Sequence, residues 1–287
     1  MKNRRRERRV HIIIVSVLAS VLGVLFIAFI SVLATSGIVA NEAKKGIENM
    51  ECDFCEELVA KIRVEEEAAA QKAMAEKIAN AVGIVYLTFD DGPGDHTERL
   101  LDILDTHNIK VTFFVTGRGS DETIKRESDE GHTVAMHTWS HKYNYVYASV
   151  ANYFADLAQI ADRVKNVTGK ESNIIRFPGG SSNTVSARYD GRTKIMSTLV
   201  NEVTARGYTY FDWNVDSDDA GRAKSADVVY NNVVSHLKPG ANVVLQHDIY
   251  DYSVDAVERI IEYGEANGYV FLPIKEDTAP VHHGVNN

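Results

Sequence analysis

Seven short apolar runs, separated by patterns of helical length, constrain the fold of this chain more than any other feature of its sequence. The runs occupy Ile84–Phe89, Val111–Val115, Thr133–Met136, Ile174–Arg176, Tyr208–Phe211, Asn242–Gln246 and Tyr269–Leu272. The helical patterns occupy Glu98–Thr106, Ser120–Glu130, Val150–Val167, Thr193–Arg206, Ser225–His236 and Val254–Asn267. Strands that alternate with helices form a mostly parallel sheet, so we expect an α/β fold. About seven strands in one stretch predict a closed or nearly closed (β/α) barrel over residues 81–275.

The amino-terminal region has the pattern of a membrane anchor. Residues 1–11 are strongly basic, and Ile12–Ala34 follows without a single charged residue. A helix of that length is about 34 Å long, which is enough to span a bilayer. Basic residues before the span predict a single-pass protein of the cell membrane, with residues 1–11 cytoplasmic and the folded domain extracellular. The alternative is a cleaved signal peptide with a site near Ala40, although its apolar region is usually shorter.

Residues 35–80 are expected to form a helical stalk. The part from Asn41 to Asn80 is rich in Ala, Glu and Lys and contains no proline, which is typical of an exposed helix. Its apolar side chains form one short stripe, made of Leu58, Val59, Ile62 and Val64. Such a stripe favours packing against a partner, for example in a stalk-mediated dimer.

The two cysteines of the chain, Cys52 and Cys55, both lie in this stalk. They provide no disulfide framework for the fold, and no strand-helix-strand pattern surrounds them to indicate a redox site. Outside the cell they can form a disulfide within the helix or to a second chain. The formal net charge of the chain is -9, which argues against nucleic acid as a partner.

The first apolar run ends in two adjacent carboxylates. The stretch Val85–Pro93 reads VYLTFDDGP, so Asp90 and Asp91 come directly after a strand and before a turn. The carboxyl edge of a parallel sheet is where α/β proteins keep their chemistry. Two neighbouring anions repel each other unless they share a cation or a proton. A solvated turn or a helix cap is the alternative interpretation.

A histidine pair follows the third run. His137 and His141, in HTWSH, are four residues apart, so on a helix both imidazoles would reach one ion. Histidines on a helix are more often packed or solvated, but this pair lies at the same predicted edge as Asp90 and Asp91. Two histidines and one carboxylate are a zinc-binding set that leaves a fourth position for water.

Three further runs also end in polar or aromatic residues. Arg176 opens RFPGG, Asp212 and Trp213 follow the fifth run, and His247 and Asp248 follow the sixth. Each motif alone also fits an ordinary loop, a core aromatic residue or a helix cap. Their gathering at one end of five strands is typical of a barrel active site.

The ordered set TFDDG, HTWSH, RFPGG, DW and LQH resembles the polysaccharide deacetylase family, also called the NodB-homology domain or carbohydrate esterase family 4. The resemblance covers roughly Val82 to Lys275. It implies a distorted (β/α) barrel that hydrolyses acetyl groups on a glycan with one divalent metal ion, zinc or alternatively cobalt or another ion.

The resemblance also implies a role for each matching residue. It makes Asp90 the base, Arg176 the residue that orients Asp90, and His247 the acid tuned by Asp212. The metal ligands would be Asp91, His137 and His141. Residues implied to lie against the substrate or its oxyanion are Gly179, Trp213 and Leu245. Many family members carry an aromatic residue where this chain has Gly179, so the aromatic wall for the sugar is in question.

The extracellular position makes N-acetylglucosamine units of peptidoglycan the leading substrate. Poly-N-acetylglucosamine, chitin fragments and O-acetylated xylan are alternatives within the family, and an inactive glycan-binding module is an alternative of another class. The base and all metal ligands are present, which favours catalysis. The acidic stretch Asp216–Arg222 would face a cationic product or be a solvated loop. Residues 276–287 are expected to form a polar tail, with His282 and His283 in solvent.

Overall fold

A computed structural model describes residues 53–287 and contains the parallel sheet expected from the sequence. The strands are β1 (Gly83–Asp90), β2 (Thr112–Val115), β3 (Thr133–Met136), β4 (Ile174–Ile175), β5 (Thr209–Tyr210), β6 (Val215–Asp216), β7 (Gly240–His247) and β8 (Tyr269–Phe271). All strand pairs are parallel, in the order β5-β4-β3-β2-β1-β7-β6. The seven predicted strands are confirmed, and the added strand, β6, is only two residues long.

The sheet curls into a barrel that stays open between β5 and β6. These two strands lie at opposite ends of the strand order, although only residues 211–214 separate them in the sequence. β1 is the central strand, with β7 along its whole length on one side. On its other side β8 pairs with the first half and β2 with the second half.

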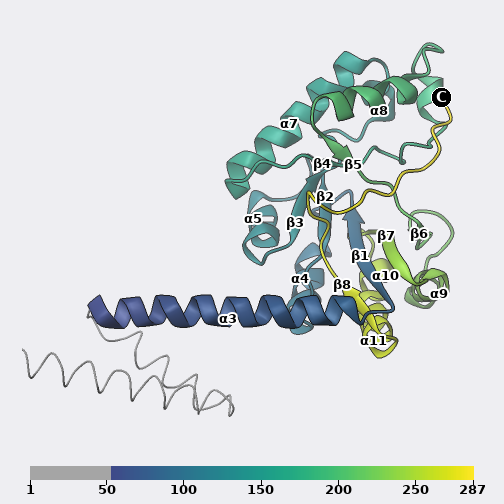
Figure 1. Ribbon diagram of the computed structural model, residues 1–287. Coiled ribbons are helices and arrows are strands. Elements are labelled where there is room, and N and C mark those ends of the chain that lie inside the picture. The colour runs from purple at the N-terminus through teal and green to yellow at the C-terminus, as the bar shows by residue number, and fades with distance from the viewer. Residues whose placement is uncertain (1–52) are drawn as a thin grey trace, which may run out of the picture. The chain divides into compact units, whose positions relative to one another are not determined.

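Apolar side chains fill both sides of the sheet. A small inner cluster gathers alternate residues of the strands, including Tyr86, Phe114, Ala135 and Val243. The larger outer core lies between the sheet and its helices, which Figure 1 shows around the strands. These helices are α4 (Thr97–Thr106), α5 (Asp121–Asp129), α7 (Val150–Thr168), α8 (Ile195–Ala205), α9 (Ala226–His236) and α11 (Val257–Ala266). Short helical turns are α6 (Tyr143–Val146), η1 (Ser186–Arg188) and α10 (Asp251–Val254).

Helix α7 illustrates how local sequence sets these boundaries. Ser149 caps its start, because the hydroxyl accepts a hydrogen bond from the Asn152 N–H. Gly169 ends it in the left-handed conformation, with φ of 72°. Between them the helix buries an apolar stripe of Tyr153, Leu157, Ile160 and Val164 against the sheet side.

The described part of the stalk region is helix α3, from Asp53 to Ala79. Contacts divide the chain into a unit that ends at Ala75 and a unit that runs from Glu76 to Asn287. The predicted span Ile12–Ala34 and the cysteine Cys52 lie outside the described residues. Among residues 53–287, none of the helices has the length and apolar character needed to cross a bilayer. The membrane anchor and the stalk-mediated dimer therefore stay predictions.

The polar tail does not extend freely into solvent. His282 stacks on Tyr210, with ring centroids 3.8 Å apart, and its Nε2 lies 3.0 Å from the Tyr210 carbonyl oxygen. The His283 N–H donates to the carboxylate of Asp212, and its ring contacts Trp213. The tail therefore packs against β5 and the residues that follow it. The expectation that both histidines are solvated is wrong for His283, which is partly buried, whereas His282 stays exposed while it stacks on Tyr210.

Candidate active site

The polar strand ends predicted from the sequence meet at the carboxyl edge of the sheet. Asp90 is the last residue of β1, and its register partner on β7 is His247. Asp91 follows Asp90, and His137 follows β3. Because all these strands are parallel, their carboxyl ends share one edge, which places these four side chains in one site.

Asp91, His137 and His141 can hold a metal ion together. Their candidate ligand atoms all lie within 4.8 Å of one another. Asp91 Oδ1 is 3.2 Å from His141 Nε2 and 3.6 Å from His137 Nε2. The same Oδ1 is buried and accepts no hydrogen bond from the described residues. A buried carboxylate oxygen without a donor, facing two imidazole nitrogens, fits a divalent cation.

The histidine pair is positioned by a loop, which corrects the prediction of a shared helix face. Residues 137–142 are not helical, and helix α6 begins only at Tyr143. Three residues of the site have left-handed backbone: Asp91 with φ of 73°, Thr138 with 64° and His141 with 52°. Such conformations cost about 1–3 kcal/mol each for residues other than glycine. The surrounding structure therefore holds the ligands in strained positions, as functional sites often do.

A contact behind the metal site orients His137. Its Nδ1 lies 2.8 Å from the carbonyl oxygen of Arg176, so Nδ1 carries the proton and Nε2 is free for a metal. Burial and the neighbouring His141 lower the pKa of His137 to about 3. The ring is therefore neutral at physiological pH, which is the form that binds a metal.

Arg176 fixes the side chain of Asp90 through a buried ion pair. The arginine side chain is fully buried, and its Nη1 donates to Asp90 Oδ1 at 2.7 Å and to Thr88 Oγ1 at 2.6 Å. Its other nitrogens donate to the carbonyl oxygens of Phe211 and Asp212. Burial raises the pKa of Asp90 above its usual value, although Arg176 and His247 counteract this. A fixed carboxylate with a raised pKa suits a general base.

His247 has a buried carboxylate partner, Asp219. The Asp219 Oδ1 lies 2.8 Å from His247 Nδ1, and Oδ2 accepts the His247 N–H at 2.7 Å. Ser253 donates a further hydrogen bond to Asp219. Burial disfavours the charged imidazole, but Asp219, Asp90 and Asp91 outweigh it and raise the pKa of His247 to about 9. His247 is therefore protonated at neutral pH and can donate a proton.

The structure corrects the role given to Asp212. Its two carboxylate oxygens accept from the N–H and the hydroxyl of Ser181, and one also accepts from the N–H of His283. The reason is topological: Asp212 follows β5, which pairs with β4, whereas Asp219 follows β6, which pairs with β7. Asp219 therefore reaches His247 and Asp212 anchors the loop after β4. The assignment of Asp212 as the tuning group of His247 was wrong.

Two of the three expected substrate residues follow β4 and β5. The Gly179 N–H makes no hydrogen bond within residues 53–287, whereas the N–H groups of Gly180 and Ser181 are both used. Trp213 is half-buried, and its ring would contact a Cβ placed on Gly180. The third, Leu245, is buried two residues before His247 on β7, so both side chains point to the same face.

Comparison with known proteins identifies the family to which this chain belongs. A family model described as polysaccharide deacetylase matches residues 77–195. A peptidoglycan-N-acetylglucosamine deacetylase of Bacillus cereus is 33% identical over 211 residues, which cover 71% of this chain and 72% of that protein. The chain belongs to the polysaccharide deacetylase family. The family resemblance noted in the sequence is thereby confirmed, and this deacetylase is a hydrolase that removes acetyl groups from a glycan.

Solved structures of other deacetylases show the same fold. The catalytic domain of a peptidoglycan N-acetylglucosamine deacetylase from Eubacterium rectale is 52% identical, with a TM-score of 0.68, and the match covers 71% of this chain and 94% of that one. A polysaccharide deacetylase from Bacillus cereus is 32% identical, with a TM-score of 0.60, over 71% of this chain and 96% of that one. Both matches support a barrel of this family.

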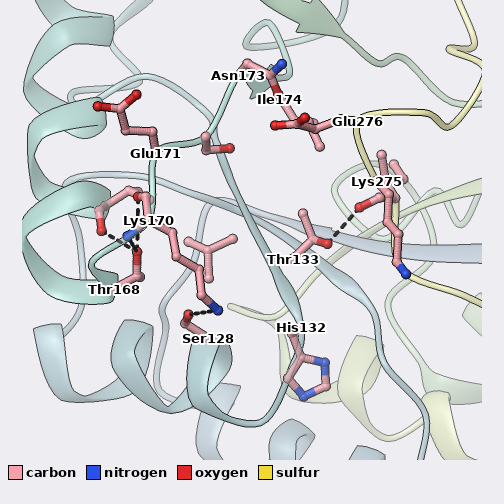
Figure 2. Close-up of a pocket in the computed structure, with 14 residues that line it drawn as sticks. Ser128, His132, Thr133, Thr168, Lys170, Glu171, Asn173, Ile174, Lys275 and Glu276 are labelled. Carbon is pink, nitrogen blue, oxygen red and sulfur yellow. Dashed lines mark hydrogen bonds between the residues drawn. The ribbon is translucent and has the colours of Figure 1, made fainter. Parts of the chain in front are cut away.

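A separate pocket of this deacetylase lies away from the metal-ligand set. Figure 2 shows His132, Thr133 and Ile174 along it, which places it at the amino ends of β3 and β4. Lys170 lines this pocket, and its Nζ donates to the Ser128 hydroxyl at 3.3 Å. The candidate ligands lie beyond the carboxyl ends of the strands, so this pocket is not the active site.

The pairing of His247 with Asp219 predicts the alkaline limit of deacetylase activity. Replacing Asp219 with Asn removes the negative charge that raises the His247 pKa, so the imidazole loses its proton at lower pH. Because His247 would act as the protonated acid, the alkaline limb of kcat/KM should move down by at least one pH unit. Asp218→Asn is the matched control, because the side chain of this neighbour forms an ion pair with the exposed Arg222. The two pH profiles measure the effect, and an unmoved limb in Asp219→Asn would contradict it.

Proposed function

We propose that this deacetylase removes the N-acetyl group of N-acetylglucosamine units in peptidoglycan, with one divalent metal ion. The observation that carries the proposal is the meeting of three groups at one sheet edge. They are the metal-ligand set of Asp91, His137 and His141, the Arg176-bound carboxylate of Asp90, and the protonated imidazole of His247. A base, a cation site and an acid are the groups that metal-assisted amide hydrolysis uses.

The residues of the chain divide the reaction between them. Asp90 accepts a proton from the attacking water, and Arg176 keeps this carboxylate aimed at it. The free N–H of Gly179 donates to the acetyl oxygen as negative charge develops there. His247 gives its proton to the leaving amine, and Asp219 holds the ring in place through Nδ1. Base and acid thus act from different strands, β1 and β7.

Asp91, His137 and His141 would hold the metal ion. When bound, a divalent cation acidifies water and polarises the acetyl carbonyl group. Two imidazole nitrogens and one carboxylate suit zinc, and cobalt has similar preferences. We propose zinc as the resident ion.

The names of the relatives support peptidoglycan as the substrate. The Bacillus cereus and Eubacterium rectale proteins are both described as peptidoglycan N-acetylglucosamine deacetylases. The test is acetate release by the purified, zinc-loaded protein from peptidoglycan, poly-N-acetylglucosamine, chitin fragments and O-acetylated xylan. Peptidoglycan should release the most acetate per enzyme. Preferential release from one of the other glycans would replace the proposed substrate, and release from none would contradict a deacetylase.

We further propose that the domain acts outside the cell from a membrane anchor at Ile12–Ala34. Support comes from the sequence, in which a long uncharged segment follows a basic start. The full-length protein should stay in the membrane fraction after a high-salt wash, and its domain should be digested when protease is added to intact wall-free cells. A mature protein that begins near Asn41 would show a cleaved signal peptide instead.

A further inference from the structure

Tyr143 lies directly against the loop that carries the Gly179 N–H. It opens helix α6, two residues after His141, and its ring meets the His141 ring edge to face at 5.5 Å. A Cβ placed on Gly179 would lie 2.6 Å from Tyr143 Oη and 3.4 Å from Tyr143 Cε1. The end of the phenol therefore occupies the space that a side chain at position 179 would need.

A second tyrosine fixes this arrangement. Tyr147, one turn along the chain, is fully buried and donates from its hydroxyl to the Pro178 carbonyl oxygen at 2.7 Å. The rings of Tyr143 and Tyr147 are in contact, with centroids 5.6 Å apart. Helix α6 is thus tied to the residue before Gly179, and the position of Tyr143 follows from that tie.

The hydroxyl of Tyr143 is available to a ligand. Within residues 53–287 it makes no hydrogen bond, although the side chain is partly buried. A phenol hydroxyl carries one hydrogen, so it can donate to an oxygen bound between itself and the metal-ligand set.

We propose that the Tyr143 hydroxyl donates a hydrogen bond to the acetyl oxygen of the substrate, beside the Gly179 N–H. This role rests on the proposed deacetylation. The aromatic residue missing at position 179 is replaced in space by Tyr143, the first residue of helix α6. Gly179 has φ of 75°, and the phenol leaves no room for a side chain there, so the glycine and Tyr143 act as a unit. The hydrogen bond from the Tyr143 hydroxyl strengthens when the acetyl oxygen becomes negative, so it stabilises the transition state more than the bound substrate.

The test compares Tyr143→Phe with Tyr145→Phe in the full-length, zinc-loaded protein. Tyr145 is the matched control, because it lies on the same short helix with its side chain exposed. Loss of one oxyanion donor lowers kcat by about 10²-fold, with KM little changed. We expect that result for Tyr143→Phe on a pentamer of N-acetylglucosamine, with metal content equal to wild type. Tyr145→Phe should match wild type.

Two other outcomes would overturn the role of Tyr143. Wild-type kcat in Tyr143→Phe would show that the ring only packs, and a raised KM with unchanged kcat would show a ground-state contact. Both leave the deacetylase function standing, because wild type would still release acetate. Absence of acetate release from the pentamer and from peptidoglycan by wild type would overturn both proposals.

A stability measurement tests the contact itself without using activity. Gly179→Ala should lower the melting temperature, because the new Cβ meets Tyr143 Oη and because the backbone is left-handed. Adding Tyr143→Phe to Gly179→Ala removes the closest overlap and should recover part of the loss. Equal destabilisation by Tyr143→Phe in both backgrounds would show that the hydroxyl does not lie on Gly179.

Discussion

Asp90→Asn should retain one bound metal ion per chain and lose about 10²–10⁴-fold in kcat, the usual cost of removing a general base. The amide has nearly the same shape, and its oxygen can still accept from Arg176, so the site should remain folded. Only the ability to accept a proton is lost. The loss should appear in kcat rather than KM, because the base acts in the transition state. Metal analysis and acetate-release kinetics measure both quantities, and excess zinc should not restore turnover.

Asp91→Asn is the matched comparison, because it makes the same chemical change one residue later. Asp91 Oδ1 is the atom that faces both histidines, so this variant should lose metal affinity, and excess zinc should restore part of its activity. Loss of metal from Asp90→Asn, together with an Asp91→Asn variant that keeps its metal but is inactive, would contradict this assignment. It would show that Asp91 is the base and Asp90 the metal ligand.

His137→Ala and His141→Ala should each lose the metal ion and reduce acetate release to background. Each removes one of three ligands from a set whose atoms lie within 4.8 Å of one another. His141→Ala is the cleaner test of ligation, because His141 is partly exposed whereas the buried His137 also contacts the Arg176 carbonyl oxygen. His236→Ala is the control, because His236 is exposed at the end of α9. Full metal content in His141→Ala would contradict the ligand assignment.

Sequence patterns predicted the parts of the site that lie at the ends of long or strongly apolar strands. The predicted strand Thr133–Met136 has the same bounds as β3, and β1 extends the predicted run Ile84–Phe89 by one residue at each end. Because parallel strands bring their carboxyl ends to one edge, these boundaries placed Asp91 and His137 together. The seven-strand barrel followed from the same alternation of strands and helices.

The missed features depend on tertiary contacts that no local pattern encodes. β6 is two residues long, so the stretch after it was interpreted as an acidic loop, and Asp219 was not recognised as the partner of His247. Left-handed backbone at Thr138 and His141 replaced the expected helix, because the loop must bring both imidazoles to one point. The positions of β5 and β6 in the sheet determine that Asp219, and not Asp212, reaches His247. The acidic stretch Asp216–Arg222, which contains Asp219, was the signal that the sequence offered.

The most direct test of metal-dependent deacetylation is acetate release from peptidoglycan by the purified, full-length protein before and after metal removal. We expect release by the zinc-loaded protein, loss of release on chelation, and recovery when zinc is returned. Asp90→Asn, treated identically, should bind zinc again without recovering release. Acetate release that persists after complete removal of metal, or equal release by Asp90→Asn, would contradict the assignment of this sheet edge as a metal-dependent deacetylation site.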